Sequence, residues 1–202
     1  MNYDYENNLI SQGYTDICGI DEAGRGSYAG PLVAGSVILD PDENELVEFL
    51  ADSKLLTAKR REQVLPMIMC KAKAWSVGLV TNEEIDLHGL GFANKIAMKR
   101  AWKHLRVTPN YILSDYMPNL SFATPFELIK SGDRKIATIA AASIVAKVFR
   151  DRMMVAFHNK YPEYEFAVHK GYGTQMHRDK LDEFGPCDLH RKSFAPIKAK
   201  LF

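Results

Sequence analysis

Four acidic residues near the ends of predicted strands are the strongest candidates for chemistry in this sequence. Asp21 and Glu22 are adjacent and follow an apolar strand. Asp115 closes a second apolar run, and Asp133 lies in a Gly-Asp turn after a third. Any one of them alone is more simply interpreted as a turn acid or a helix-capping acid. Carboxylates brought within a few ångströms repel one another unless a cation neutralises them. If these strand ends converge, the sequence predicts a cation site.

The chemistry of such a site follows from its ligands, which are all carboxylate oxygens. Oxygen-only ligand sets suit the hard cations Mg²⁺ and Mn²⁺ rather than zinc. Two such ions about 3.5–4 Å apart would stabilise the attacking and leaving oxygens of an in-line phosphoryl displacement. The acids therefore indicate metal-dependent phosphodiester chemistry in which no side chain acts as the nucleophile.

Two glycine-rich segments are candidates for contacting a nucleotide. Gly24-Arg25-Gly26 lets backbone N–H groups approach a ligand beside a guanidinium, although a tight turn with a solvated arginine is an equal alternative. Further on, Lys170 offers a cation for a phosphate and Tyr172 a ring for stacking, with a loop holding a partly buried tyrosine as the alternative. Weaker phosphate candidates follow near the C-terminus: His177, His190, Arg191 and Ser193.

The elements that position these residues alternate between strands and helices. Strands are predicted at 16–21, 32–39, 74–80, 111–115 and 126–130, each an apolar or β-branched run. Helices are predicted at 57–72, where Pro66 implies a kink or an early stop, from a Thr81/Glu84 capping box, at 92–106 and over 135–160. Residues 161–202 are expected to form loops and short helices. This order predicts a mixed α/β sheet flanked by helices, with a catalytic domain over 1–160 and a C-terminal segment packed on it.

The composition of the chain places few limits on function. Its 202 residues, 47% of them hydrophobic, are enough for one domain with its own core. The sequence lacks an apolar run long enough for a membrane span, and its first residues lack a signal peptide pattern, so a cytoplasmic protein with no membrane partner is expected. Cys18, Cys70 and Cys187 are widely spaced and are expected to be reduced thiols.

Four segments, taken in order, resemble the ribonuclease HII family. They are GIDEAGRGSYAGPLVAG, DSKLLTAKRRE, GDRKIATIAAASIVAKVFRD and HKGYGTQMH, and the similarity covers about residues 16–194. The resemblance implies the ribonuclease H-like fold with a small helical C-terminal extension. It implies an endonuclease that hydrolyses the RNA strand of RNA–DNA hybrids and cuts 5′ to ribonucleotides embedded in duplex DNA. The products would carry 5′-phosphate and 3′-hydroxyl ends, and the enzyme is expected to be a monomer.

The same resemblance implies roles for individual residues. The four acids Asp21, Glu22, Asp115 and Asp133 would be both catalytic and metal-binding. Gly24, Arg25 and Gly26 would contact the ribose 2′-hydroxyl, which DNA lacks, and Tyr172 would stack on the sugar of the next deoxynucleotide. The remaining substrate contacts are expected to be phosphate ligands: Lys54, Ser143, Lys147, Lys170, His190 and Arg191.

One departure from the family pattern concerns the third acid. In this family the third acid is commonly followed by glycine, whereas here Asp115 is followed by the bulky Tyr116. Three alternative functions are open: a related nuclease or recombinase acting on DNA, a hybrid-binding module without catalysis, and a small-molecule α/β enzyme. The GRG turn with Tyr172 argues against the first and the complete set of acids against the second. Against the third, the sequence contains neither a nucleotide-cradle motif nor a nucleophile motif.

Overall fold

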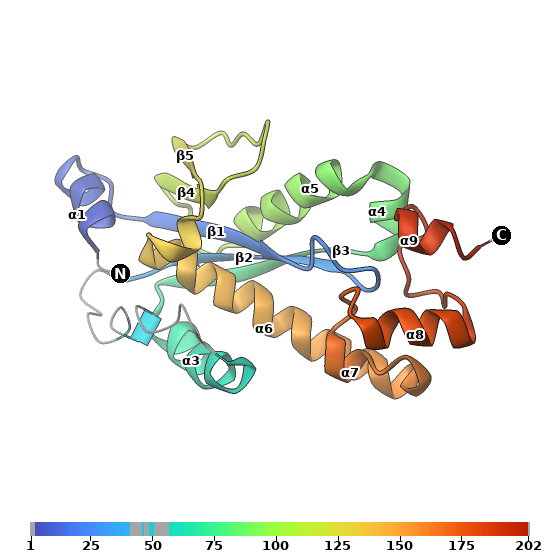
Figure 1. Cartoon of the computed structure of the whole chain (residues 1–202). Helices are drawn as coiled ribbons and strands as arrows, with labels where there is room; N and C mark the ends of the chain where they lie inside the picture. Colours follow the sequence, from blue (N-terminus) through green and yellow to red (C-terminus); the bar gives the residue numbers. More distant parts are fainter. Residues whose placement is uncertain (1–2, 41–45, 47–48, 51–56, 202) are drawn as a thin grey trace.

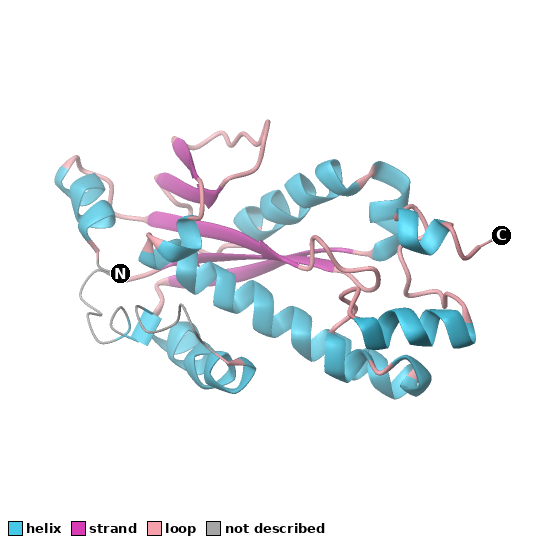
Figure 2. Ribbon diagram, in the orientation of Figure 1, coloured by secondary structure: helices cyan, strands magenta, loops and turns pink. Residues whose placement is uncertain are grey.

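A five-stranded mixed sheet forms the centre of the computed structural model, which describes residues 3–40, 46, 49–50 and 57–201. The strand order is β3-β2-β1-β4-β5 (Figure 2). β1 pairs antiparallel with β2 and parallel with β4, while β2–β3 is antiparallel and β4–β5 parallel. The bounds are Ile17–Ala23 for β1, Leu32–Ile38 for β2, Ala74–Val80 for β3, Tyr111–Asp115 for β4 and Phe126–Ile129 for β5. The predicted mixed sheet is confirmed.

Helices cover both faces of this sheet (Figure 1). The long helix α6 (Ala137–Lys160) crosses β1 and β2 on one face, and α3 (Ala58–Lys71) packs against α6. On the other face α5 (Leu90–Lys103) follows the short helix α4 (Asn82–His88) and packs on β3 and β2. At the N-terminal end α1 spans Asp4–Ser11. The sheet is therefore the middle layer of three, and its central strand β1 is covered from both sides.

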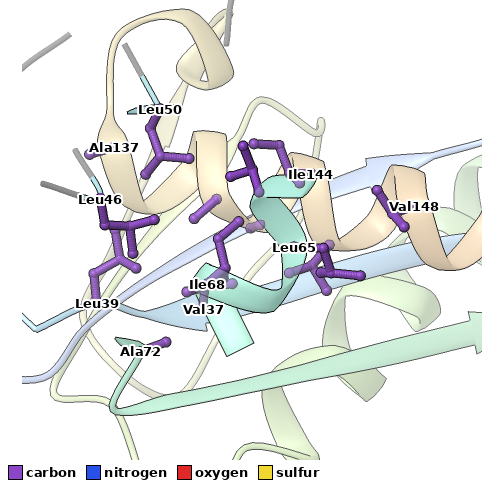
Figure 3. Packing of buried hydrophobic residues seen from close by; sticks show 14 of the residues in the cluster. Val37, Leu39, Leu46, Leu50, Leu65, Ile68, Ala72, Ala137, Ile144 and Val148 are labelled. Atoms are coloured by element: carbon purple, nitrogen blue, oxygen red, sulfur yellow. The ribbon is translucent and has the colours of Figure 1, made fainter. Parts of the chain in front are cut away.

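Apolar side chains fill the layer between α3, α6 and the sheet (Figure 3). Leu65 and Ile68 of α3 meet Ile144 and Val148 of α6 over Val37 of β2, and all five are buried. This matches the predicted helical spacing of apolar residues in 135–160. Burying such side chains is worth roughly 1.5–3 kcal/mol each, so this layer fixes α6 firmly on β1 and β2.

Two strand glycines let α6 approach the sheet closely. A Cβ at Gly19 would lie 2.1 Å from the Thr138 carbonyl carbon, and one at Gly35 would lie 2.2 Å from the Ala142 carbonyl oxygen. Any larger residue would push the helix away from the strands. The close contact brings the middle of α6 within side-chain reach of β1.

The local predictions differ from the structure mainly at the helix ends and at one proline. The Thr81/Glu84 capping box is present and begins α4. The helix predicted over 57–72 is present as α3, which continues past Pro66 to Lys71. Of the two effects expected at the proline, a kink or an early stop, the early stop is absent. Pro66 is the ninth residue of α3, and a proline inside a helix removes a backbone hydrogen bond. Packing of the buried Val64, Leu65 and Ile68 compensates for this loss.

The C-terminal segment consists of short helices and loops, as predicted. It contains the 3-10 turn η3 (Pro162–Tyr164), α7 (Phe166–His169), α8 (Gln175–Phe184) and α9 (Ala195–Lys198). Its apolar residues Tyr164, Phe166 and Leu189 pack on Met154 of α6 and on Ala29. The segment therefore rests on the end of α6 and on the connection between β1 and β2 (Figure 1). Across the described residues, every helix is too short or too polar to span a bilayer.

Candidate active site

Three of the four predicted acids converge beside the centre of the sheet. One carboxylate oxygen from each of Asp21, Glu22 and Asp115 lies within 4.8 Å of the other two. The first two belong to β1, and Asp115 is the last residue of the adjacent parallel strand β4. The expected meeting of strand acids is present for these three residues.

Asp21 and Glu22 are oriented by helices on opposite faces of the sheet, because successive strand residues point to opposite sides. The Ser143 side chain of α6 hydrogen-bonds to the Asp21 carboxylate. On the other face, Nδ2 of Asn94 in α5 donates to Oε1 of Glu22 at 3.1 Å. Each covering helix therefore supplies one side chain that fixes one acid.

Burial and neighbouring acids raise the pKa of both Asp21 and Glu22. Burial raises the pKa of Asp21 well above its usual value, and the neighbouring charges of Glu22 and Asp115 raise it further. Burial also raises the pKa of Glu22, where the Asn94 hydrogen bond acts in the opposite direction and Asp115 adds to the rise. Negative charge is thus concentrated where the protein gives it little compensation, which is the electrostatic condition that a cation relieves.

An unpaired oxygen indicates where such a cation fits. Oε2 of Glu22 is buried and has no hydrogen-bond partner among the described residues. Buried polar atoms are nearly always paired, and one without a partner costs about 1–3 kcal/mol. A cluster of carboxylate oxygens that includes one free buried acceptor fits a hard divalent ion. These three acids therefore form a possible metal site.

Asp133 lies beside this cluster rather than within it. It belongs to the 3-10 turn η2 (Gly132–Arg134), which is tied to the site because the Gly132 N–H donates to Oδ1 of Asp115 at 2.8 Å. Its side chain lines the same pocket as Glu22. A role as the fourth metal ligand stays a prediction for this residue.

A pocket of about 710 Å³ opens next to the acids and contains most of the predicted substrate residues. It brings together residues from the β1 end, α3, η2, α6 and the loop after α7. The predicted residues that line it are Glu22, Gly24, Arg25, Gly26, Asp133, Ser143, Lys147 and Tyr172. Segments far apart in the sequence thus form one surface that carries both acidic and basic side chains.

The Tyr172 ring is held in this pocket by two cations of α6. Nζ of Lys147 lies 4.9 Å from the ring centroid, and the guanidinium of Arg150 lies 5.1 Å from it. Lys147 also pairs with Asp151 at 2.9 Å. Cations placed over an aromatic face are attracted by its quadrupole. The ring is therefore fixed on one side, and it remains half-buried in the pocket wall.

Arg150 also supports the glycine-rich turn from below. It is fully buried and donates to the carbonyls of Pro31 and Ala29 and to Oγ of Ser27. Gly24 has φ of 91°, and a Cβ there would lie 2.0 Å from Nε of Arg150. Only glycine satisfies both the backbone angle and the close contact. The GRG turn is thus a shaped support rather than a loose loop.

Three of the predicted contacts that the structure describes lie outside the pocket lining. His190 and Arg191 are fully buried, so they do not reach the pocket surface as phosphate ligands would. Arg191 instead donates to the carbonyls of Arg25 and Gly30. Lys170 lines a smaller neighbouring pocket of about 300 Å³ and donates to the Ala167 carbonyl. Lys54 lies outside the described residues.

Four residues near the site were not among the predicted ones. Arg61 and Arg134 line the pocket, Asn94 orients Glu22, and Arg150 supports the turn. Arg61 and Arg134 stand inside the DSKLLTAKRRE and GDRK segments, so their position beside the predicted residues was a usable signal. Asn94 and Arg150 lie on helices whose spacing indicates packing only, and their partners become visible only in three dimensions.

Comparison with known structures defines the class of protein. The ribonuclease H2 structure from Pyrococcus horikoshii OT3 matches with a TM-score of 0.77 and 28% sequence identity, covering 91% of this chain and 96% of that one. Bst-RNase HIII in complex with Mn²⁺ shares the fold with a TM-score of 0.73 at 16% identity, covering 93% of this chain and 70% of that one. The fold and the acid cluster define a nuclease of the ribonuclease H type.

Sequence comparison narrows the class to one family. The model of the family described as Ribonuclease HII matches residues 18–197. Ribonuclease HII of Acidothermus cellulolyticus is 46% identical over 196 residues, and this chain spans 64% of that protein's length while 97% of the chain is covered. The chain belongs to the ribonuclease HII family.

Proposed function

We propose that this chain hydrolyses the RNA strand of RNA–DNA hybrids and cuts 5′ to ribonucleotides embedded in duplex DNA. Cleavage leaves 5′-phosphate and 3′-hydroxyl ends. The observation that carries the proposal is a single pocket lined by Glu22 of the acid cluster and Asp133 together with the GRG turn and Tyr172. A nuclease that selects ribonucleotides needs both a cleavage site and a reader of the sugar, and a shared pocket supports assigning both roles to its lining residues.

The GRG turn is suited to reading a ribose. Gly26 is exposed, and a Cβ there would meet open space, so a ligand can approach its backbone closely. Ser27 Oγ donates to the Gly24 carbonyl, which holds the turn in shape without occupying its outer face. The 2′-hydroxyl is both a donor and an acceptor, and it distinguishes RNA from DNA at a given position. Tyr172 then supplies a ring for the adjacent deoxynucleotide.

The cations that line the pocket suit the phosphate backbone. Lys147, Arg61 and Arg134 line the pocket together with the Ser143 hydroxyl. Contacts to phosphates fix the register of a protein on a duplex and carry no sequence information. An enzyme that recognises a sugar rather than a base sequence therefore gains affinity from these residues. Lys54 is proposed as a further phosphate contact from its motif alone.

Asp21, Glu22 and Asp115, with Asp133 as the fourth ligand, would hold Mg²⁺ or Mn²⁺. When bound, such ions lower the pKa of water and stabilise charge on the attacking and leaving oxygens. The protein itself contributes orientation: Ser143 and Asn94 fix two of the acids, and Gly132 fixes the third. Preorganised ligands of this kind avoid reorganisation during the reaction. The monomeric state is likewise proposed from the sequence.

The test is cleavage of a labelled DNA duplex that contains one ribonucleotide. The expected result is one cut 5′ to the ribonucleotide, only with Mg²⁺ or Mn²⁺, and abolished reversibly by EDTA. An RNA–DNA hybrid should be cut and an all-DNA duplex left intact. Cleavage of the all-DNA duplex at a similar rate would refute the ribonucleotide specificity, and tight hybrid binding without cleavage in any metal would favour a binding module.

A further inference from the structure

A cluster of three buried histidines lies behind the pocket wall and takes no part in the chemistry described above. His169 ends α7, His177 lies on α8, and His190 lies in the loop before α9. The exposed fractions are 6% for His169 and 0% for His177 and His190. The His169 and His177 rings are stacked with centroids 4.2 Å apart. Buried imidazoles in such close contact need an arrangement that satisfies every ring nitrogen.

The hydrogen bonds assign one neutral tautomer to each ring of the pair His177 and His190. Nδ1 of His177 lies 3.0 Å from the Tyr172 carbonyl, so it carries the proton and donates. Nε2 of His177 must then accept from Nε2 of His190, which lies 3.0 Å away. Nδ1 of His190 in turn accepts from the Cys187 N–H at 2.9 Å. The result is a directed chain in which each neutral ring donates once and accepts at its other nitrogen.

His169 also hydrogen-bonds to the backbone at both ring nitrogens, and its proton lies on Nε2 rather than on Nδ1 as in His177. Its Nε2 lies 2.6 Å from the Tyr164 carbonyl and donates to it, while its Nδ1 accepts from the Gly171 N–H at 3.1 Å. The backbone on both sides of Lys170 is therefore held by histidine rings. Lys170 and Gly171 both have positive φ, of 53° and 79°, so this turn depends on outside contacts to keep its shape.

The histidine chain connects two backbone segments that enclose the β1–β2 connection. On one side, Ser27 bridges to Tyr172, and the Tyr28 N–H donates to the Gly171 carbonyl at 2.7 Å. On the other side, Ala29 bridges to His190, and the Gly30 N–H donates to the Leu189 carbonyl at 2.9 Å. Residues 27–30 thus lie between the two segments. The bond between His177 and His190 closes the third side of this arrangement.

The surroundings of the hydrogen-bonded histidines favour neutral imidazole rings. Tyr28, Tyr164 and Phe166 pack against the imidazoles with ring centroids 5.1–5.8 Å apart. The nearby titratable or charged groups are Tyr164, Glu163 and Glu165 next to α7, Lys170 and Tyr172 after it, Cys187, Asp188 and Arg191 around His190, and Arg150 from α6. Burial lowers the pKa of His177 to about 3 and that of His190 to about 4. A second proton on either ring would set two donors against each other.

We propose that His177 and His190 are positioning residues, which as a pair of neutral rings hold Tyr172 and the connection 27–30 in the arrangement that receives the substrate. The proposal rests on the proposed function, because the histidine pair anchors Tyr172, which is the substrate-facing residue in that function. His177 acts through the Tyr172 carbonyl, and His190 acts through the segment that flanks Ala29. Neither ring touches the substrate.

The tautomers can be measured directly in the wild-type protein. Long-range ¹H–¹⁵N correlation spectra at pH 5.5 to 8 should show His177 as the Nδ1–H tautomer and His190 as the Nε2–H tautomer, with neither ring titrating. A His177 ring in the Nε2–H form, or either ring titrating near pH 6.5, would overturn the proposal. These spectra need no variant and no substrate.

Two substitutions at His177 separate the two bonds of the chain. His177→Asn keeps a donor near the position of Nδ1 and loses the bond to His190, whereas His177→Gln reaches toward His190 and loses the donor to the Tyr172 carbonyl. Loss of one such bond predicts that His177→Gln raises KM for a duplex with one ribonucleotide roughly fivefold to tenfold. His177→Asn should raise it less, and kcat should change little in both.

The control variant is His104→Gln, because His104 is exposed at the far end of α5. The affinity for Mn²⁺, measured by calorimetry, should be unchanged in His177→Asn, His177→Gln and His104→Gln, because none of these histidines contacts the acids. Equal KM values in folded wild type and His177→Gln would overturn the positioning role. If the wild-type enzyme cut no ribonucleotide-containing duplex at all, the proposed function would fail, whereas the tautomer spectra would still decide the histidine arrangement.

Discussion

Two clusters of titratable residues, one of acids and one of histidines, are built in opposite ways. The acid cluster of Asp21, Glu22 and Asp115 collects like charges and leaves Oε2 of Glu22 without a partner. The histidine cluster pairs the nitrogens of His177 and His190 with each other or with backbone groups. Burial raises the pKa of Asp21 and of Glu22 and lowers the pKa of His177 and of His190. Both clusters therefore resist charge, but only these two histidines satisfy their hydrogen bonds internally.

The difference separates a binding site from a support. A closed hydrogen-bond chain has no capacity left for a ligand, because each lone pair and each N–H is already used. A cluster with repulsion and a free buried acceptor is incomplete and gains free energy when a cation arrives. Both clusters contain several titratable residues. They differ in whether their hydrogen-bonding atoms find partners within the protein.

The strongest test of this distinction is removal of one charge from the acid cluster. Asp115→Asn preserves shape but removes a central ligand charge, so we expect turnover to fall by about a thousandfold or more, as the loss of the main electrostatic stabilisation implies. Binding of the hybrid should change little, because the cations that line the pocket remain. Single-turnover cleavage and hybrid affinity, measured on the same preparation, check both parts.

Asp133→Asn is the matched comparison for that experiment. Asp133 lines the pocket but lies outside the three-acid group. If it is the fourth ligand, its loss should also reduce turnover strongly and should raise the metal concentration needed for half-maximal rate. Activity retained in Asp115→Asn would contradict the assignment of the acid cluster as the reaction centre.

Stability without metal should also distinguish the two clusters. An acid whose folded pKa is raised destabilises the fold as pH rises from its unfolded value through its folded value. A histidine whose folded pKa is lowered destabilises it as pH falls from about 6.5 toward the folded value, which is about 4 for His190. Above pH 6.5 only the acids still contribute. In EDTA at pH 8, Asp21→Asn should therefore be more stable than wild type by about 1–3 kcal/mol, the cost of a buried polar group without compensation.

Denaturant unfolding between pH 5 and pH 8 measures this difference. The advantage of Asp21→Asn should shrink as the pH falls, because the raised pKa of Asp21 lets the wild-type carboxylate take up its proton at a higher pH than an ordinary aspartate does. Adding Mg²⁺ should reverse the order, because only the wild type retains the full ligand set, and a ligand at a hundred times its Kd adds about 2.7 kcal/mol. A less stable Asp21→Asn in EDTA at pH 8 would show that the acids are not in conflict.

The sequence predicted the acid cluster better than the residues around it. Strand ends converge when the strands are neighbours, and the acids Asp21 and Asp115 stand at recognisable ends, so the pattern along the chain was sufficient. The sheet, α6 and the capping box followed from periodicity in the same way. These features depend on local spacing, which a single sequence displays directly.

The residues that were misplaced or missed depend on burial, which spacing does not reveal. His190 and Arg191 follow each other in a polar loop, and the sequence alone gave no sign that the loop folds under residues 27–30. Pro66 lies within α3 because distant apolar contacts outweigh the local preference. Asn94 stands between apolar residues of α5 and has no motif, yet its amide reaches Glu22. Tertiary contacts decided each of these cases.

A smaller effect than that of Asp115→Asn is expected at Asn94, which links the covering helix to the acid cluster. Its Nδ2 donates to Glu22 at 3.1 Å and contacts Sδ of Met117 at 3.2 Å, so Asn94→Ala should free Glu22 to rotate. Substitutions of residues that orient metal ligands commonly weaken metal binding by about tenfold or more. Asn82→Ala is the matched control, because Asn82 is also buried and donates to the Asp188 carbonyl away from the acids. Calorimetric titration with Mn²⁺ should show weaker binding for Asn94→Ala alone. Equal affinity in both variants would mean that β1 and its neighbours orient Glu22 without help from α5.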